Sequence, residues 1–424
     1  MSKQENKMSN SFKIMCVNAG SSSIKFKLYE MDKKASSAKT IKEKSALMTV
    51  LCSGLVERIG HDDAIFTLKK PGGYKNSKTL PIMNHDEGVQ LVLNGLIEEK
   101  VVASLDEING IGNRVVQGGK YFSDSALFNQ DTYNKIEELI PLDPLHAEAH
   151  LTCFNAFKKA LPNVGEVAVF DTAYHQTMPA KEFMYGIPYE WYEKYDVRRY
   201  GAHGTSHKYL AQYAWEEYFP NKEHLNIITC HIGSGASLAA IHDGKVVATS
   251  MGLTPLAGVM MGTRTGDIDP SCMPFIMKCT GLTADEVYDA YNHKGGLLGI
   301  SGISNDTRDV EDAYKKGDER AKLALDMYAG RIADYIMMYY GKLGHVDMIV
   351  CSAGVFENAP LYRAQAFEAV SEALGIKIDE KLNAETRLGK EGIISAKDSK
   401  VPVVVIPTDE ELMIALDTAR VLGL

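Results

Sequence analysis

Two short segments rich in glycine and serine lie between apolar stretches and could bind phosphate. The first, residues 18–23, follows the apolar residues 12–17 and precedes residues 24–30, in which apolar side chains recur at every second position. The backbone N–H groups of such a turn can converge on phosphate oxygens, its serine hydroxyls add donors, and Lys25 supplies a positive charge. A single tip of this kind is as often a simple tight turn.

The same design recurs about half a chain length later. Apolar residues 227–232 lead into the small-residue turn 233–237, and apolar residues 238–242 follow it. An Asp243-Gly244 turn then precedes a further strand from Lys245, as expected for strands joined by tight turns. The repetition favours phosphate binding over two unrelated turns.

A third place in the chain combines a strand, a small-residue turn and a helix. The apolar stretch 348–351 runs into the small-residue segment 352–358, and residues 361–374 have the pattern of a helix. Backbone N–H groups at a helix N-terminus attract anions. This arrangement adds a third candidate phosphate-binding segment.

Composition and charge describe an ordinary folded protein. A chain of 424 residues exceeds what one core usually organises, so we expect two domains. The net charge of −9 argues against general affinity for nucleic acid or anionic membranes. No apolar run approaches the roughly 20 residues that cross a bilayer, and residues 1–11 lack the apolar stretch of a signal peptide. We therefore expect a cytoplasmic protein without nucleic-acid or membrane partners.

The cysteines predict neither a disulfide framework nor a zinc site. There are seven of them, and none forms a Cys-x-x-Cys pair. Cys16, Cys230 and Cys351 lie inside apolar, strand-like stretches, where a free cysteine behaves as a small core residue. We interpret these three thiols as buried, reduced and structural.

Strands and helices alternate along the chain, which indicates an α/β protein with mixed sheets. Further strands are predicted at residues 166–170, just before Asp171, and at 401–406. Residues 32–45 are rich in lysine and serine and are expected to form a solvated loop. We place a domain boundary just after Asp171, with the C-terminal segment returning to the first domain.

Five longer motifs resemble those of the acetate kinase family, in that family's order and spacing from about residue 13 onward. They are residues 18–25, 170–179, 199–207, 260–270 and 407–413. The resemblance implies the fold of the acetate and sugar kinase, Hsp70 and actin superfamily. That fold is α/β, with two ribonuclease-H-like (actin-like ATPase) domains around a cleft. We assign residues 12–172 plus 408–424 to the first domain and 173–407 to the second, and expect a homodimer.

The resemblance also implies the chemistry. It is the reversible reaction of ATP with acetate to give ADP and acetyl phosphate by direct in-line phosphoryl transfer. Asn18 and Glu410 would hold Mg²⁺, with Mn²⁺ as an alternative metal, because hard cations prefer oxygen ligands. Asp171, His203 and Arg264 match the catalytic residues. Arg264 and His203 would stabilise charge in the transition state, and Asp171 would orient the metal or the acceptor.

Substrate and nucleotide residues follow from the same motifs. Arg114 matches the arginine that binds the substrate carboxylate, since its planar fork can contact both oxygens. Val116, Leu145 and Pro255 would form an apolar wall that suits a methyl group. The nucleotide-binding residues implied lie in four places along the chain: Lys25, His231, Ile232, Gly233, Ser234, Gly235, Asp306, Thr307, Arg308, Gly354, Val355, Phe356, Glu357 and Asn358.

Three departures from the family bear on specificity. Ala202 stands where the family usually has a phenylalanine in the acyl pocket, so propionate or another short acid is an alternative acceptor. Ser234 replaces an asparagine in the second phosphate turn. Phe356 replaces a glycine, and its ring could stack on the base or block it. An altered phosphoryl donor such as GTP or pyrophosphate is therefore a further alternative.

Other departures are Asn113 and Gln117, which replace histidines, and Ala257, which replaces a glutamate. An alternative of a different class is a nucleotide-binding regulator on the same fold, because fold does not determine function. An enzyme is favoured over a regulator because the chain retains the residues that match the family's site: Arg114, Asp171, His203, Arg264 and Glu410.

The remaining histidines are assigned ordinary roles. His175 and His207 are expected to be structural hydrogen-bonding residues, and His61, His85 and His224 to lie at the surface.

Overall fold

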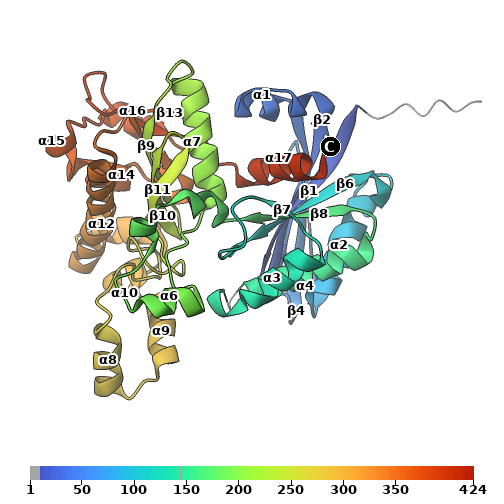
Figure 1. Ribbon diagram of the computed structural model, residues 1–424, viewed down its shortest axis with the longest axis horizontal. Helices are drawn as coiled ribbons and strands as arrows, with labels where there is room; N and C mark the ends of the chain where they lie inside the picture. Colours follow the sequence, from blue (N-terminus) through green and yellow to red (C-terminus); the bar gives the residue numbers. More distant parts are fainter. Residues whose placement is uncertain (1–9, 144–145) are drawn as a thin grey trace, which may run out of the picture. The chain divides into compact units, whose positions relative to one another are not determined.

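The chain forms two compact units, each with a sheet and helices (Figure 1). The structure is a computed structural model that describes residues 10–143 and 146–424. Unit 1 comprises Met1–Ala173 and Asp409–Leu424, and unit 2 comprises Tyr174–Thr408. The mixed α/β class predicted from the sequence is confirmed. Among the described residues, no helix combines the length and apolar character needed to span a membrane.

Unit 1 is built on one twisted sheet. In the described residues it has eight strands in the order β5-β4-β3-β2-β1-β6-β8-β7. β1 pairs antiparallel with β2 and parallel with β6, which pairs parallel with β8. The strands are β1 (Ser11–Gly20), β2 (Ser23–Asp32), β3 (Met48–Glu57), β4 (His61–Lys70), β5 (Tyr74–Ile82), β6 (Ile108–Val115), β7 (Ala126–Leu127) and β8 (Gly165–Phe170).

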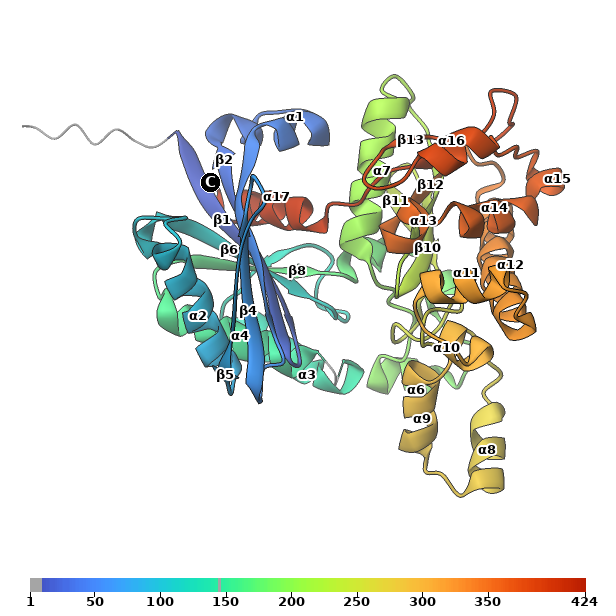
Figure 2. The same cartoon turned by 180° about the vertical axis from the view of Figure 1, so that it is seen from behind.

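Helices cover both faces of this sheet (Figures 1 and 2). On one face, Val89 and Leu93 of α2 and Phe157 of α4 pack against the strands. On the other face, Ile414 and Ala415 of α17 pack against β1 and β8. The helices are α1 (Ile41–Ala46), α2 (His85–Glu98), α3 (Gln130–Glu138), α4 (Ala147–Ala160) and α17 (Glu410–Leu422), with 3-10 turns at Lys33–Ser36, Leu105–Glu107 and Ile140–Leu142.

The close approach of α17 to β6 depends on a glycine. A Cβ atom on Gly112 would lie 2.2 Å from Thr418 Oγ1 and 2.6 Å from a methyl group of Ile414. No larger residue fits there without moving the helix. Asp409 caps the helix by accepting a hydrogen bond from the backbone N–H of Leu412 at 3.0 Å. The N-terminus of α17 is thereby held beside the sheet.

Unit 2 repeats the strand pattern of unit 1. β9 pairs antiparallel with β10 and parallel with the later strand β12, as β1 does with β2 and β6. The repeated hairpin predicted from the sequence is therefore confirmed. The sheet order is β11-β10-β9-β12-β14-β13. Its strands are β9 (Asn226–Ile232), β10 (Ala236–His242), β11 (Lys245–Thr249), β12 (Met348–Ser352), β13 (Gly392–Ile393) and β14 (Val403–Val405).

The core of unit 2 joins this sheet to the long helix α12, through residues such as Leu325, Tyr328 and Ile332. The helices are α5 (Ala180–Phe183), α6 (Tyr189–Tyr195), α7 (Gly204–Tyr218), α8 (Cys272–Thr280), α9 (Ala284–His293), α10 (Gly296–Ser301), α11 (Thr307–Lys315), α12 (Glu319–Leu343), α13 (Ala353–Asn358), α14 (Pro360–Glu368), α15 (Ser371–Leu374) and α16 (Glu380–Glu385). A 3-10 turn at Ala173–Thr177 begins at the last residue of unit 1.

The expected loop at residues 32–45 is wrong, because the segment contains a 3-10 turn and α1. Two apolar side chains within it, Ala35 and Ile41, are buried. Thr40 and Glu43 form a reciprocal capping box at the start of α1. Burial of two apolar residues and a capped end stabilise structure that a lysine-rich composition conceals.

Three other element predictions need correction. The expected turn at 352–358 is mostly α13, and the expected helix at 361–374 is divided into α14 and α15. Pro360 stands at the start of α14, where its missing N–H costs nothing. The strand expected at 401–406 is shorter, covering Val403–Val405.

The predicted burial of three cysteines is confirmed, and the histidine predictions are confirmed with one exception. Cys16, Cys230 and Cys351 are buried and free. His175 and His207 are fully buried and hydrogen-bonded, and His61 and His224 are exposed. The prediction that His85 lies at the surface is wrong. His85 is buried, and its Nε2 lies 2.9 Å from the carbonyl oxygen of Gly20. His85 thus supports the end of β1.

Candidate active site

In unit 1, three polar side chains meet at the ends of adjacent strands. Arg114 of β6 donates two hydrogen bonds to Asp171, which follows β8: Nε to Oδ1 at 3.2 Å and Nη2 to Oδ2 at 2.6 Å. Arg114 Nη1 also donates to Oδ1 of Asn18 in β1 at 3.2 Å. Burial lowers the pKa of Arg114, but the charges of Asp171 and Glu410 outweigh it and raise that pKa above the ordinary value. The guanidinium is permanently charged.

Glu410 adds a carboxylate to this cluster from the first turn of α17. Burial raises the pKa of Glu410, and the nearby charge of Arg114 opposes that shift. Among the described residues, no group of three or more His, Cys, Asp or Glu side chains is arranged to hold a metal. The cluster supplies instead one amide oxygen and two carboxylates, which suits a cation that keeps several waters and binds few protein ligands.

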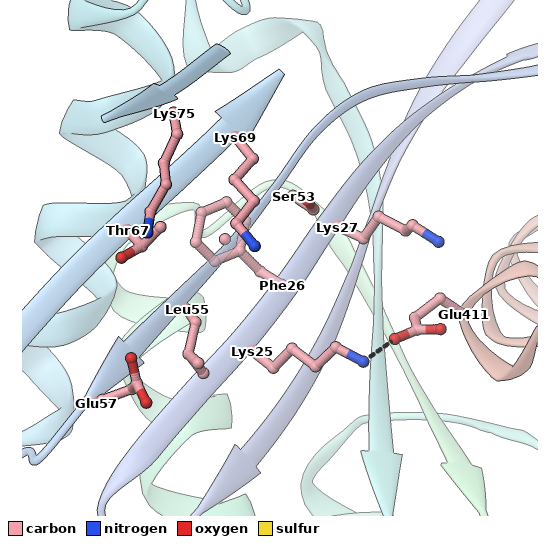
Figure 3. A pocket seen from close by; sticks show the side chains of 11 residues that line it. Lys25, Phe26, Lys27, Ser53, Leu55, Glu57, Thr67, Lys69, Lys75 and Glu411 are labelled. Atoms are coloured by element: carbon pink, nitrogen blue, oxygen red, sulfur yellow. Dashed lines mark hydrogen bonds and ion pairs between the residues drawn. The ribbon is translucent and has the colours of Figure 1, made fainter. Parts of the chain in front are cut away.

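Lys25 lies on the same sheet face, at the register position opposite Asn18. Its Nζ forms an ion pair with Glu411, the second residue of α17 (Figure 3). The side chain is 59% exposed. The lysine expected to contact nucleotide phosphate is therefore held by a carboxylate, beside the cluster of Asn18, Arg114 and Glu410.

The apolar wall is described only in part. Val116 is buried directly after β6, and its backbone N–H donates to Nε2 of His150 at 3.3 Å. Burial lowers the pKa of His150 to about 3, so this ring is neutral and can accept that hydrogen bond. Leu145 lies outside the described residues, and Pro255 belongs to unit 2. Of the three residues expected in this wall, Val116 is thus the one described within unit 1, two residues after Arg114 in the chain.

The unusual residues flanking Arg114 have structural partners. Asn113 is buried and donates through Nδ2 to Glu166 Oε2 at 2.9 Å. Gln117 is buried and accepts from the backbone N–H of Gly119 at 2.9 Å. Both side chains serve local structure in unit 1.

In unit 2, His203 is held by a chain of neutral hydrogen-bonding groups. Its Nδ1 lies 2.8 Å from Ser237 Oγ, which also lies 2.8 Å from His207 Nε2. His207 Nδ1 in turn lies 2.7 Å from Thr229 Oγ1. Burial strongly lowers the pKa of His207, so this ring is neutral. His203 itself has a left-handed backbone with φ of 58°, which is strained for a residue other than glycine.

A second histidine packs on the first. The rings of His203 and His231 are stacked with centroids 4.1 Å apart. His231 Nδ1 lies 2.7 Å from Ser206 Oγ, which lies 2.8 Å from Thr408 Oγ1. The position and orientation of the His203 ring are thus fixed from two sides.

The side chain of Arg264 ends at the small-residue turn 233–237, as that of His203 does. A Cβ atom on Gly235 would lie 3.4 Å from Arg264 Nη1 and 3.6 Å from His203 Nε2, so the two side chains converge on the second phosphate turn. Arg264 Nη1 donates to the carbonyl oxygen of Pro255 at 3.2 Å. Burial lowers its pKa, and the described residues place no carboxylate against it. A half-buried guanidinium without an acidic partner is suited to an anionic ligand.

Next to this turn lies a cavity of about 610 Å³. It unites segments that are far apart in the chain: the turn after β9, the start of α11, and α13. The residues implied in nucleotide binding that line it are Gly233, Ser234, Asp306, Thr307, Arg308, Gly354, Val355 and Asn358. Gly354 has open space where a Cβ would stand. The volume is that of a small-molecule site.

The other implied nucleotide residues of this unit do not line the cavity. His231 and Ile232 are buried in β9, and Gly235 lies on the side of His203 and Arg264. Glu357 Oε1 accepts from the backbone N–H groups of Ala353 at 2.8 Å and Thr408 at 3.1 Å, so it secures the start of α13.

The expectation that the Phe356 ring stacks on the nucleotide base or blocks it is wrong for the cavity of unit 2. Its ring is fully buried in the core of unit 2 and tilts against Phe367 at 6.4 Å between centroids. On a helix, this side chain points away from the cavity that Val355 lines. Phe356 therefore neither stacks on a base there nor blocks the cavity. Ala202 likewise is only 4% exposed and belongs to the same core.

Leu388 also lines the cavity, and nothing in the sequence pointed to it. Its side chain is 83% exposed, and its φ of 57° is left-handed. Its N–H donates to Asn358 Oδ1 at 3.0 Å. The buried Arg363 holds the same region, bonding the carbonyl oxygens of Phe356 and, at 2.9 Å, Thr386. A strained, exposed leucine at a cavity rim is a candidate ligand-contacting residue.

Fold and site together define the class: an α/β protein of the actin-like ATPase type with a nucleotide-sized cavity beside a phosphate turn. The chain belongs to the acetokinase family, whose model matches residues 13–416. An acetate kinase from Geobacillus kaustophilus is 49% identical over 412 residues, which cover 97% of this chain and 100% of that protein. The predicted family and reaction class, a phosphotransferase with a carboxyl group as acceptor, are confirmed.

Solved structures show the same likeness. The crystal structure of acetate kinase from Porphyromonas gingivalis superposes with a TM-score of 0.89 at 43% identity, covering 97% of this chain and 100% of that one. A propionate kinase from Francisella tularensis gives a TM-score of 0.87 at 37% identity, covering 96% and 99%.

Proposed function

We propose that the protein catalyses the reversible reaction of ATP with acetate to give ADP and acetyl phosphate, by direct in-line transfer. The observation that carries this proposal is the cavity of about 610 Å³ next to the turn where His203 and Arg264 converge. A nucleotide in this cavity would direct its phosphates toward two groups that can stabilise negative charge. The relatives named acetate kinase support acetate as acceptor.

Unit 1 would bind the acceptor and the metal. Arg114 donates from Nε and from one hydrogen of Nη2 to Asp171, and from one hydrogen of Nη1 to Asn18, which leaves one hydrogen on each of Nη1 and Nη2 for a carboxylate. The oxygens of Asn18, Asp171 and Glu410 fit Mg²⁺, for which Mn²⁺ could substitute. When bound, the metal would neutralise phosphate charge. Asp171 acts by fixing the guanidinium, because a carboxylate acceptor needs no base.

Unit 2 would stabilise the transferring phosphoryl group. A neutral His203 can donate from Nε2 only if its Nδ1 accepts the hydrogen of Ser237. Ser237 Oγ must then accept from His207 Nε2, and His207 Nδ1 must accept from Thr229. The observed distances allow this chain of hydrogen bonds in one consistent direction. Arg264 adds the positive charge, and exclusion of water would prevent hydrolysis.

Acetate is preferred over longer acids in this proposal, although propionate should also react. One methylene in an apolar pocket changes binding by only about 1–3 kcal/mol. Ala202 is only 4% exposed, and its small side chain keeps propionate as the alternative acceptor. The buried ring of Phe356 removes the argument for an altered phosphoryl donor.

We also propose that the protein is a homodimer. We place it in the cytoplasm, because its donor ATP is present there. α8 has no buried residue among those described, and apolar side chains near it are exposed: Phe275 by 64%, Ile268 by 40%, Tyr288 by 39% and Leu282 by 37%. An exposed apolar patch of this kind typically packs on a partner.

The testing experiment measures initial rates of acyl phosphate formation, trapped as the hydroxamate, with Mg²⁺. Acetate and propionate are each combined with ATP, GTP and pyrophosphate. We expect acetate with ATP to give the highest kcat/KM. Nucleotide binding without turnover for any pair would contradict the proposal and favour a regulator on the same fold.

A further inference from the structure

A groove on the sheet of unit 1 combines a cavity with an unusual set of charges (Figure 3). The cavity has a volume of about 280 Å³ and lies over β2, β3 and β4. Four lysines line it: Lys25, Lys27, Lys69 and Lys75. Two carboxylates, Glu57 and Glu411, line it as well, which leaves a formal excess of two positive charges. The whole protein has a net charge of −9, so this patch is opposite in sign.

Strand register places three of these lysines in one row. Lys27 is paired with Ser53, Ser53 with Lys69, and Lys69 with Lys75. In an antiparallel sheet, side chains at paired positions project from the same face about 4.5–5.5 Å apart at Cβ. Lys69 and Lys75 are therefore directly opposite neighbours, and their like charges destabilise the empty groove. A bound anion would remove that repulsion.

Lysines on the opposite face of the β4–β5 hairpin have carboxylate partners. Lys70 has Glu99 at 3.6 Å, and Lys78 has Glu98 at 3.0 Å, so each is paired with a carboxylate of the α2 region. The ammonium groups of Lys69 and Lys75 form no ion pair or hydrogen bond with any described side chain or carbonyl oxygen. Figure 3 shows both side chains in the groove, with that of Lys75 near Thr67. Both side chains are exposed and lack a carboxylate partner among the described residues, whereas the neighbouring lysines have one.

The remaining two lysines connect the groove to the candidate active site. Lys25 pairs with Glu411, and Lys27 Nζ lies 3.8 Å from Asp409 Oδ1. Both acidic partners flank Glu410 at the start of α17. An anion between Lys69 and Lys75 that also reached Lys25 would compete with Glu411 for it.

From this geometry we infer a binding site for a small, multiply charged anion of the diphosphate type. Two unpaired ammonium groups and the hydroxyl of Ser53 favour a ligand with two anionic groups over one with a single group. The volume equals that of about nine water molecules, which is enough for a diphosphate and some of its hydration. The residues that line the groove include none of Asn18, Arg114, Asp171 and Glu410, so the site is distinct from the unit 1 cluster and adjoins it through Lys25 and Glu411.

The test uses the full chain and pyrophosphate, with orthophosphate for comparison, in calorimetric titrations without metal. The Lys69→Ala/Lys75→Ala double variant should lose a pyrophosphate-binding event, with Kd raised about tenfold or more, whereas Lys69→Arg/Lys75→Arg should retain it. A matched double variant at exposed lysines of unit 2, Lys381→Ala/Lys397→Ala, removes the same net charge and should bind as the unaltered protein does. Orthophosphate should bind at least about tenfold more weakly than pyrophosphate.

A second readout locates the ligand without relying on folding of the variants. Mass spectrometry follows the rate at which an amine-specific reagent labels individual lysines of the unaltered protein. Pyrophosphate should slow labelling of Lys69 and Lys75 about fivefold or more and leave Lys381 unchanged. Equal labelling with and without pyrophosphate would overturn the inference, as would unchanged binding by the alanine double variant or an equal loss in the unit 2 control. None of these readouts depends on catalysis.

Discussion

The two units organise their candidate site residues by opposite means. In unit 1, Arg114 is held by a carboxylate at two points and by an amide oxygen. In unit 2, His203 is held by hydroxyls and a neutral imidazole, and Arg264 has only a carbonyl oxygen and a methionine sulfur as described partners. Buried charges need compensation. Unit 1 compensates its charge within the protein, and unit 2 leaves a charge to be compensated by a ligand.

This difference assigns a task to each unit. A guanidinium fixed by Asp171 presents its remaining donors in one orientation, which suits a planar carboxylate. An uncompensated cation beside a neutral histidine chain suits a phosphoryl group, whose charge is spread over three oxygens. Substitutions in each unit should therefore affect different kinetic constants.

The largest effect is expected for His203→Ala. Loss of a donor to the transferring group should lower kcat about 10²–10³-fold with little change in either KM. The hydroxamate assay measures this. His224→Ala, at an exposed histidine paired with Asp243, should stay within about twofold. An active His203→Ala enzyme would show that the chain of hydroxyls and imidazoles has no catalytic purpose.

A smaller effect is expected for Ser237→Ala, which breaks the hydrogen-bond chain but leaves His203 in place. Without Ser237, the tautomer of His203 is no longer fixed, so kcat should fall about 10–50-fold. Ser237→Thr keeps the hydroxyl and should restore most of the rate. An equal loss in both variants would point to packing instead.

Leu388→Ala tests the cavity rim. Loss of an exposed apolar contact with the base should raise the KM for ATP about 5–10-fold and leave kcat and the KM for acetate unchanged. Leu323→Ala, at another leucine that is 52% exposed but lies on α12 away from the cavity lining, is the matched control. Identical kinetics for the two variants would remove Leu388 from the site.

The smallest effect on turnover is expected for Glu166→Gln, whose consequence is for stability. Burial raises the pKa of Glu166 to about 8, against the opposing hydrogen bond from Asn113. Between pH 4.5 and 8 the folded state therefore binds more protons than the unfolded state, so the free energy of unfolding falls as pH rises. Glu166→Gln should remove this slope and be more stable above pH 8, by roughly 2–4 kcal/mol.

Denaturant unfolding at several pH values measures that slope. Glu148→Gln, at an exposed glutamate of α4, should leave the slope unchanged. An unaltered slope in Glu166→Gln would mean that another group titrates.

The sequence predicted what depends on local pattern. The repeated hairpins were visible because apolar strands flank the small-residue turns, and motif resemblance identified the family. Contacts between distant segments were not visible. Leu388 lines the cavity together with Asn358, 30 residues earlier, which accepts its N–H. Phe356 seemed to face the base because no local pattern tells which side of α13 is buried.

The unit 1 cluster illustrates the same limit. Arg114, Asp171 and Glu410 could be named from motifs, but the ion pair of Arg114 with Asp171 depends on the register of β6 against β8. Likewise, Lys25 resembled a phosphate ligand, and only the placement of α17 reveals its pairing with Glu411.

The most direct test of the division of tasks is the pair of KM values of Arg114→Lys. Lysine keeps the positive charge opposite Asp171 but loses the two-point fork. The KM for acetate should rise about tenfold or more, with the KM for ATP within about twofold of the unaltered enzyme. A rise in the KM for ATP equal to that for acetate, or no change in either, would contradict the assignment of the carboxylate to unit 1.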